Sequence, residues 1–118
     1  MSYVFEVDDT TVWSPGLRVG ALYVSMAECL ATWAGVPSGL APMASDYYIV
    51  DVEVFKAFVQ AVLKDPSFGH PVLGELARGI IATSLVMLSR AAVPLPEIGP
   101  GAEPLTELVT ALATKMPA

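Results

Sequence analysis

Residues 71–92 form the predicted helix that most restricts the fold, because this segment is apolar around nearly its whole circumference. Eleven uncharged residues, Gly79–Ser89, lie between Arg78 and Arg90. A membrane-spanning helix needs roughly 20 apolar residues, so this shorter run indicates a buried core helix. Only a thin polar stripe remains along it, and other elements must therefore cover the helix on most sides.

A second strongly apolar helix is predicted earlier in the chain. Ser14 offers a hydroxyl N-cap, Pro15 suits the first helical position, and Gly35 ends the helix after about Ala34. Its polar residues share one narrow stripe. Most of its circumference is covered by apolar residues, namely Val19, Leu22, Tyr23, Met26, Cys29, Leu30 and Trp33. We expect this helix to be embedded on more than one side.

Two ordinary amphipathic helices complete the helical set. One runs from about Val52 to Leu63 and follows Asp51, whose carboxylate suits the N-cap position. The other begins at Pro104 and extends to about Met116. Each has one apolar face and needs one packing surface. The sequence leaves open whether the last helix packs on its own domain or on a neighbouring chain.

The remaining segments predict a hairpin and two irregular stretches. Residues 3–7 and 10–13 are β-prone runs that flank the turn-forming pair Asp8-Asp9. A two-stranded ribbon is marginally stable alone, so it must pack on the helices. Residues 36–50 are rich in proline and glycine and predict an ordered loop, and residues 93–102 predict a second loop or tether.

These elements predict a mainly α fold, a small bundle of about four helices with an N-terminal β-hairpin packed on it. A chain of 118 residues suits a single domain. We expect that helical domain to span residues 1–118. Its expected parts are the hairpin (1–13), a three-helix core (14–92), and a Pro/Gly loop with the C-terminal helix (93–118).

Charge, cysteine content and motifs narrow the function classes. Twelve acidic and six basic residues give a formal net charge of −6, which disfavours nucleic acid because phosphates are neutralised by clustered Lys and Arg. The single Cys29 has no disulfide or CxxC partner, and its apolar neighbours indicate burial. Glycine-rich phosphate loops are absent, so no cofactor is expected. Without a secretory signal or a spanning segment, we expect a cytoplasmic protein with no membrane partner.

A surplus of apolar residues favours a protein partner. The chain is 54% hydrophobic with a mean hydropathy of +0.60, more apolar surface than so small a domain hides easily. The sequence therefore predicts a non-enzymatic interaction or accessory subunit. It would bury apolar helix surface in a homo-oligomer or in a complex with a larger enzyme or toxin. Trp13, Trp33 and the methionines are expected to fill the core, with an exposed interface patch as the alternative.

The alternative function is a small cofactor-independent enzyme or a small-molecule binder, of lyase, isomerase or cyclase type, with a helix-lined apolar pocket. Its candidate catalytic residues are Asp46, His70, Tyr47, Tyr48 and Glu28. Asp46 beside two tyrosines could work with His70 in acid–base chemistry. Structural roles compete with this interpretation, because aspartate caps turns and His70 directly precedes a helix. No spacing of metal ligands is present, and no metal is expected.

Several motifs together resemble a known family. They are Tyr3-Val4-Phe5-Glu6-Val7, Trp13-Ser14-Pro15, Pro37-Ser38-Gly39, Pro42-Met43 with Asp46, Asp51-Val52-Glu53, His70-Pro71-Val72, and Gly79 with Ala82-Thr83. The chain resembles a family of small actinobacterial proteins catalogued only as a domain of unknown function. The resemblance covers nearly the whole chain, names no activity and transfers no site residues. It implies a setting of bacteria rich in secondary metabolism and interbacterial conflict, where an accessory, immunity or tailoring protein would fit.

Overall fold

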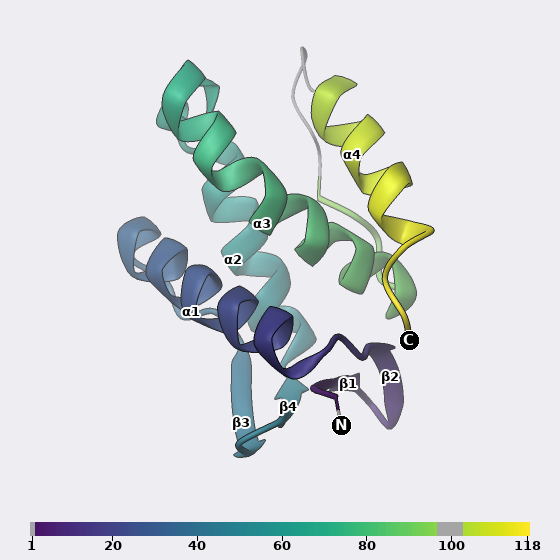
Figure 1. Cartoon of the computed structure of the whole chain (residues 1–118). Helices are drawn as coiled ribbons and strands as arrows, with labels where there is room; N and C mark the ends of the chain where they lie inside the picture. Colours follow the sequence, from purple (N-terminus) through teal and green to yellow (C-terminus); the bar gives the residue numbers. More distant parts are fainter. Residues whose placement is uncertain (1, 97–102) are drawn as a thin grey trace.

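The computed structural model describes residues 2–96 and 103–118 of the chain. Its elements are β1 (Val4–Val7), β2 (Thr10–Trp13), α1 (Leu17–Ala34), β3 (Leu40–Ala44), β4 (Tyr47–Val50), α2 (Val52–Lys64), the 3-10 helix η1 (Pro66–Gly69), α3 (Pro71–Arg90) and α4 (Glu103–Ala113). Figure 1 shows the strands gathered at one end of the molecule, with the helices stacked beyond them.

The fold is α+β, and the expectation of a helical bundle with a single hairpin is wrong. The strands form one four-stranded mixed sheet in the order β2-β1-β4-β3. β1 pairs antiparallel with β2, as the predicted hairpin requires, and β3 pairs antiparallel with β4. β1 lies parallel to β4, so the two hairpins join through their inner strands. The segment 36–50, predicted to be a loop, therefore contains half of the sheet.

The β3–β4 hairpin was not predicted because its segment is rich in proline and glycine, which indicate a loop. Pro42 has no N–H for a ladder, but it lies in β3 at the edge of the sheet, where proline is tolerated. Gly39 turns the chain into β3 with a φ of +84°, and its carbonyl accepts a hydrogen bond from the Asp51 N–H at 2.9 Å. The aromatic and branched residues Tyr47–Val50 then form a strand because β1 is available beside them.

The helices begin close to their predicted starts. Asp51 is the N-cap of α2, as predicted, and its Oδ1 accepts a hydrogen bond from the Val54 N–H at 3.3 Å. In α1 the N-cap is Gly16 instead of the predicted Ser14. The Ser14 hydroxyl donates to the carbonyl of Tyr3 at 3.0 Å, which ties the start of the helix to the sheet.

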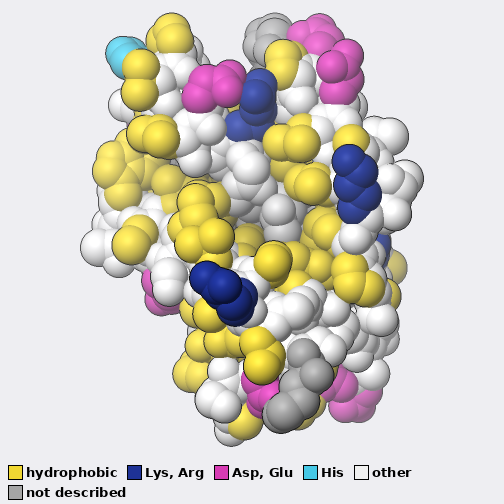
Figure 2. All heavy atoms as spheres, viewed as in Figure 1, with side chains coloured by type: hydrophobic (Ala, Val, Ile, Leu, Met, Phe, Trp, Pro, Cys, Tyr) yellow, Lys and Arg dark blue, Asp and Glu magenta, His cyan; other side chains and the backbone are white. Residues whose placement is uncertain are grey.

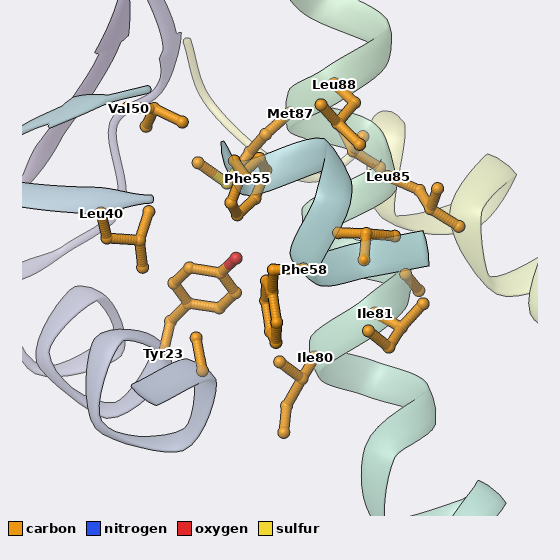
Figure 3. Close-up of a cluster of buried hydrophobic side chains, with 14 of the residues drawn as sticks. Tyr23, Leu40, Val50, Phe55, Phe58, Ile80, Ile81, Leu85, Met87 and Leu88 are labelled. Atoms are coloured by element: carbon orange, nitrogen blue, oxygen red, sulfur yellow. The ribbon is translucent and has the colours of Figure 1, made fainter. Parts of the chain in front are cut away.

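The core lies where α2 and α3 meet the sheet and α1 (Figure 3). Phe55 and Phe58 project from α2 and are 1% and 0% exposed. On the sheet side, the ring of Phe5 stacks against Trp13 with centroids 5.3 Å apart. Trp13 is buried, which confirms the core role predicted for it. Tyr23 of α1 meets this aromatic stack edge-on, 5.7 Å from Phe5.

α3 is the central helix, as predicted, and it contacts every other helix of the described chain. By length and composition it could also span a membrane, with 20 residues and a hydropathy of 1.5, but 44% of that window is buried inside the protein. The nearly continuous burial from Ile80 to Leu88 accounts for this apolar character. The chain is compact, with a radius of gyration of 13.2 Å, and its cytoplasmic location stays a prediction.

The last helix packs on its own chain. Leu105 of α4 and Met116 beyond it are buried. Arg90, at the end of α3, donates to three carbonyl oxygens, those of Val12, Ala113 and Met116, at 3.0, 3.1 and 2.7 Å. This guanidinium therefore joins β2 to the C-terminal segment. The last helix thus packs on its own domain, a point that the sequence left open.

The buried hydroxyl of Tyr23 is expected to stabilise the fold through a hydrogen bond. Its oxygen lies 2.6 Å from Ser84 Oγ. Ser84 Oγ itself donates to the Ile80 carbonyl at 2.8 Å, so Tyr23 is the donor to Ser84. Burial raises the pKa of Tyr23 above its ordinary value of 10.0. Tyr23→Phe is expected to lower the free energy of unfolding at pH 7 by about 1 kcal/mol.

The same group makes stability depend on alkaline pH. Because the folded state favours the protonated phenol, its contribution is complete below pH 10 and is lost as the pH rises towards the raised pKa. Above about pH 10, the free energy of unfolding measured in urea should fall more steeply with pH for the wild type than for Tyr23→Phe. The difference between the two slopes should reach up to about 1.4 kcal/mol per pH unit. Identical pH dependence in the two proteins would contradict this assignment.

Candidate functional site

An apolar groove lies between α1, α3 and α4 on the face shown in Figure 2. It has a volume of about 620 Å³, and a second hollow of about 370 Å³ continues it between α1 and α3. Met26, Leu76 and Ile80 line both parts, so the two form one surface, which we call the helical groove. Figure 2 shows hydrophobic side chains, in yellow, on both sides of the hollow.

The α1 wall exists because this helix has two apolar faces. Its inner face packs into the core through Tyr23, Ala27, Leu30 and Ala31. Its outer stripe is exposed and consists of Val19, Leu22, Met26, Cys29 and Trp33. These five residues follow one another at alternating intervals of three and four. That spacing places side chains along one side of a helix, where they can pack against another helix.

The α3 wall repeats the spacing. Leu73, Leu76, Ile80 and Thr83 line the groove at intervals of three, four and three. Ten large hydrophobic side chains are exposed in the described part of the chain. Five of them line the groove: Val19, Leu22, Met26, Trp33 and Leu76. Scattered apolar residues are normal on a protein surface, but a concentration such as this marks an interaction site.

α4 and the C-terminal segment close one end of the groove. Leu108 and Leu112 line it from α4, and buried Met116 follows them. The backbone N–H of Ser14 donates to the carbonyl of Pro117 at 2.7 Å, beside the contacts of Arg90. The end wall is thus held by hydrogen bonds of the chain itself, and the groove is preformed.

Charged residues of both signs lie on this face (Figure 2), and exposed Glu107 directly precedes Leu108 of the α4 wall. Arg78 donates to Glu75, a groove residue, at 2.8 Å in a solvent-exposed pair. Lys115 lines the groove, and Arg18 is exposed next to the wall residue Val19. Neither Lys115 nor Arg18 forms an ion pair with any residue in the described ranges. Figure 2 shows basic side chains on opposite sides of the hollow.

Three of the candidates from the sequence, Asp46, Tyr47 and Tyr48, lie in the β3–β4 hairpin. The backbone carbonyl of Asp46 accepts a hydrogen bond from Val4 at 2.9 Å. The Tyr47 hydroxyl donates to the carboxylate of Glu6, and this hydrogen bond raises the pKa of Tyr47. Burial raises the pKa of Tyr48, whose ring belongs to the aromatic stack on the sheet. The pairing of β1 with β4 accounts for all three positions.

His70 and Glu28 form separate hydrogen bonds. His70 caps α3, since its Nδ1 accepts a hydrogen bond from Val72 at 3.2 Å, and the start of α3 is at the opposite end of the molecule from the β3–β4 turn (Figure 1). Glu28 accepts a hydrogen bond from the hydroxyl of Ser38. Its charge adds to the effects of burial and Tyr3 on the pKa of Tyr48. The structure does not bring Asp46 and His70 together, and none of the five candidates lines the helical groove.

Cys29 differs from its predicted environment. It was expected to be buried because of its apolar neighbours, but it is exposed on the outer stripe of α1 while Leu30 and Ala31 face the core. Trp33 is likewise 45% exposed instead of filling the core. Over residues 2–96 and 103–118, no group of three or more His, Cys, Asp or Glu could hold a metal ion.

The fold and the groove define a small α+β protein with a preformed, helix-lined apolar surface. The chain belongs to the DUF6086 family of unknown function, whose family model matches residues 1–118. This match confirms the resemblance to a domain of unknown function. Comparison with curated proteins and with solved structures gave no match.

Proposed function

We propose that this protein is a non-enzymatic interaction subunit that binds another protein chain in the helical groove. The observation that carries the proposal is the concentration of exposed apolar side chains along the groove, where the four large ones on α1 face exposed Leu76 on α3. Leu22 and Leu76 are 60% and 69% exposed on opposite walls. A partner that covers both walls would bury these side chains at once.

The energetics of such binding are favourable. Burying a Leu, Val or Met side chain fully contributes about 1.5–3 kcal/mol relative to leaving it exposed. The groove walls are already ordered by the core and by the Arg90 hydrogen bonds, so binding requires little reordering of this chain. A few large side chains at the centre of a patch commonly supply most of an interface's affinity.

The polar groups favour this role over the enzymatic alternative. A ligand site needs a few convergent polar groups around an apolar cavity. In the helical groove Glu75 is already paired with Arg78, and the chief remaining polar side chains are Ser25, Thr83 and Lys115. The proposed acid–base pair, Asp46 and His70, lies outside the groove.

The double variant Leu22→Glu/Leu76→Glu tests the proposal, because it places charges on both walls. Wild-type protein purified from its native source is expected to carry a stoichiometric protein partner, or to form an oligomer detectable by light scattering. The double variant should bind its partner with an affinity at least about tenfold lower than that of the wild type. Circular dichroism checks that both proteins are folded.

A matched control uses Met43→Glu/Ile49→Glu, which changes two apolar residues of β3 and β4 that are 58% and 41% exposed. Neither residue lines the groove. This control should retain the partner at the wild-type level. Equal loss in both double variants, or a wild-type monomer without a partner, would sink the proposal.

A further inference from the structure

We infer that α4 and the residues after it form a latch that releases from α3 as a single unit, and that its release extends the floor of the helical groove. This unit comprises residues 103–118, and we call it the C-terminal latch. The inference concerns the conformations of this chain and does not rest on the proposed function. It is carried by the few buried side chains of the latch, the position of its hydrogen bonds, and the stripe of α3 that it covers.

Few side chains of the C-terminal latch are buried. Of residues 103–118, only Leu105 and Met116 are buried, whereas α2 has four buried residues and α3 has nine. α3 is also the only element of the described chain against which α4 packs extensively. Parts of a protein with few buried apolar contacts open at a lower free energy than its core. A helix of 11 residues is marginally stable alone in water, so α4 should unfold when it leaves α3.

Hydrogen bonds hold the latch at its C-terminal end. The guanidinium of Arg90 donates to the carbonyl oxygens of Ala113 and Met116. The backbone N–H of Ser14 donates to the carbonyl oxygen of Pro117. The three acceptors lie within residues 113–117, so a movement of this end away from α3 breaks these bonds together. Arg90 also donates to a carbonyl of β2, and the donor therefore stays in place when the latch leaves.

The latch covers a stripe of α3 that continues the floor of the helical groove. The stripe follows intervals of four, three and four residues, which place its members on one side of the helix: Gly79, Thr83, Val86 and Arg90. Gly79 and Thr83 line the groove, and Arg90 holds the latch. Val86 lies between them and is only 2% exposed. α4 packs along α3 on this side (Figure 1), so its release would uncover Val86.

Release of the latch would give the groove a second, larger form. In the closed form α4 bounds the groove, with Leu108 and Leu112 in its wall. In the open form that wall is gone, and the apolar floor continues along α3 to Val86. A molecule that binds one form more tightly than the other shifts the equilibrium between them. The latch therefore regulates how much apolar surface this face of the protein offers.

Thiol labelling tests whether Val86 becomes accessible before the whole protein unfolds. Two variants, Val86→Cys and Val59→Cys, are made in a Cys29→Ser background, because the exposed Cys29 would itself react. Val86 and Val59 are 2% and 0% exposed, and Val59 belongs to the buried face of α2. The Val86→Cys variant should react with an aromatic disulfide reagent at least about tenfold faster than the Val59→Cys variant, and its rate should rise less steeply with urea. Equal rates with equal urea dependence would overturn the inference.

Hydrogen exchange of the wild-type chain gives a second measurement, which stays decisive if a cysteine variant fails to fold. At low urea concentrations, the amides of Leu108, Leu112 and Ser14 should share one opening free energy and one small urea slope, because all three are released together. The amide of Phe58 in α2 should require a higher opening free energy and show a steeper slope. Opening of the latch only together with Phe58 would overturn the inference. So would exchange rates that increase gradually towards the end of the chain, as in fraying.

Discussion

Gly39→Ala is expected to lower the free energy of unfolding by more than about 3 kcal/mol, because the added methyl group has no space and the backbone conformation opposes it. The φ of Gly39 is +84°. A Cβ there would lie 2.6 Å from the backbone nitrogen of Phe55 and 2.9 Å from the carbonyl oxygen of Asp51. Both atoms belong to the first turn of α2, and the side chain of Phe55 lies in the core. The steric clash could therefore be removed only by moving the helix itself.

Gly35→Ala provides the matched control. Gly35 also has a positive φ, +75°, but no heavy atom lies within 4 Å of a Cβ at this position. This variant should lose only about 1 kcal/mol, the cost of the left-handed conformation. Urea unfolding of both variants at pH 7 measures the difference. Equal losses would show that the close approach of Gly39 to α2 is unimportant.

Arg90→Met is expected to cost about 3 kcal/mol and to loosen the C-terminal segment. The three carbonyls of Val12, Ala113 and Met116 all lose their charged donor, while the apolar stem of the side chain is retained. Arg90→Lys should recover only part of the loss, because an ammonium group lacks the planar fork that reaches several acceptors.

Thermal unfolding and hydrogen exchange check this prediction. Faster exchange should appear at Ser14, whose N–H bonds to Pro117, and in α4. Arg78→Met is the control, since its exposed pair with Glu75 contributes no more than about 0.5 kcal/mol. If Arg78→Met proved as costly as Arg90→Met, the guanidinium of Arg90 would not be the link that holds the end wall of the groove.

The helices were predictable because their signals are local. Asp51 and Pro71 mark helix starts within a few residues of themselves, and the nearly complete apolar circumference of residues 71–92 identified α3 as the central helix. The sheet was only half predictable. β4 becomes a strand through its pairing with β1, far away in sequence, and Pro42 is acceptable in β3 only because this strand lies at an edge. Neither condition is visible within the segment 36–50.

The sequence predicted an excess of apolar surface on two helices, but it did not predict which side chains would form the groove. The apolar surplus pointed to α1 and α3, yet Cys29 was assigned to the core because its neighbours are apolar. Comparing the outer spacing of α1 with its inner set, Tyr23 and Ala27, would have separated the two faces. The polar candidates could not be sorted in this way, since the distance between Asp46 and His70 depends on how the whole chain folds.

The parallel pairing of β1 with β4 has a consequence for the order of folding. Each hairpin and each helix can form from neighbouring residues, whereas the β1–β4 ladder closes a loop of about 40 residues and bears the associated entropic cost. We therefore expect the two hairpins to form early and to join late. The sheet would then be finished from its middle, by the union of two preassembled halves, and not by adding strands one after another at an edge.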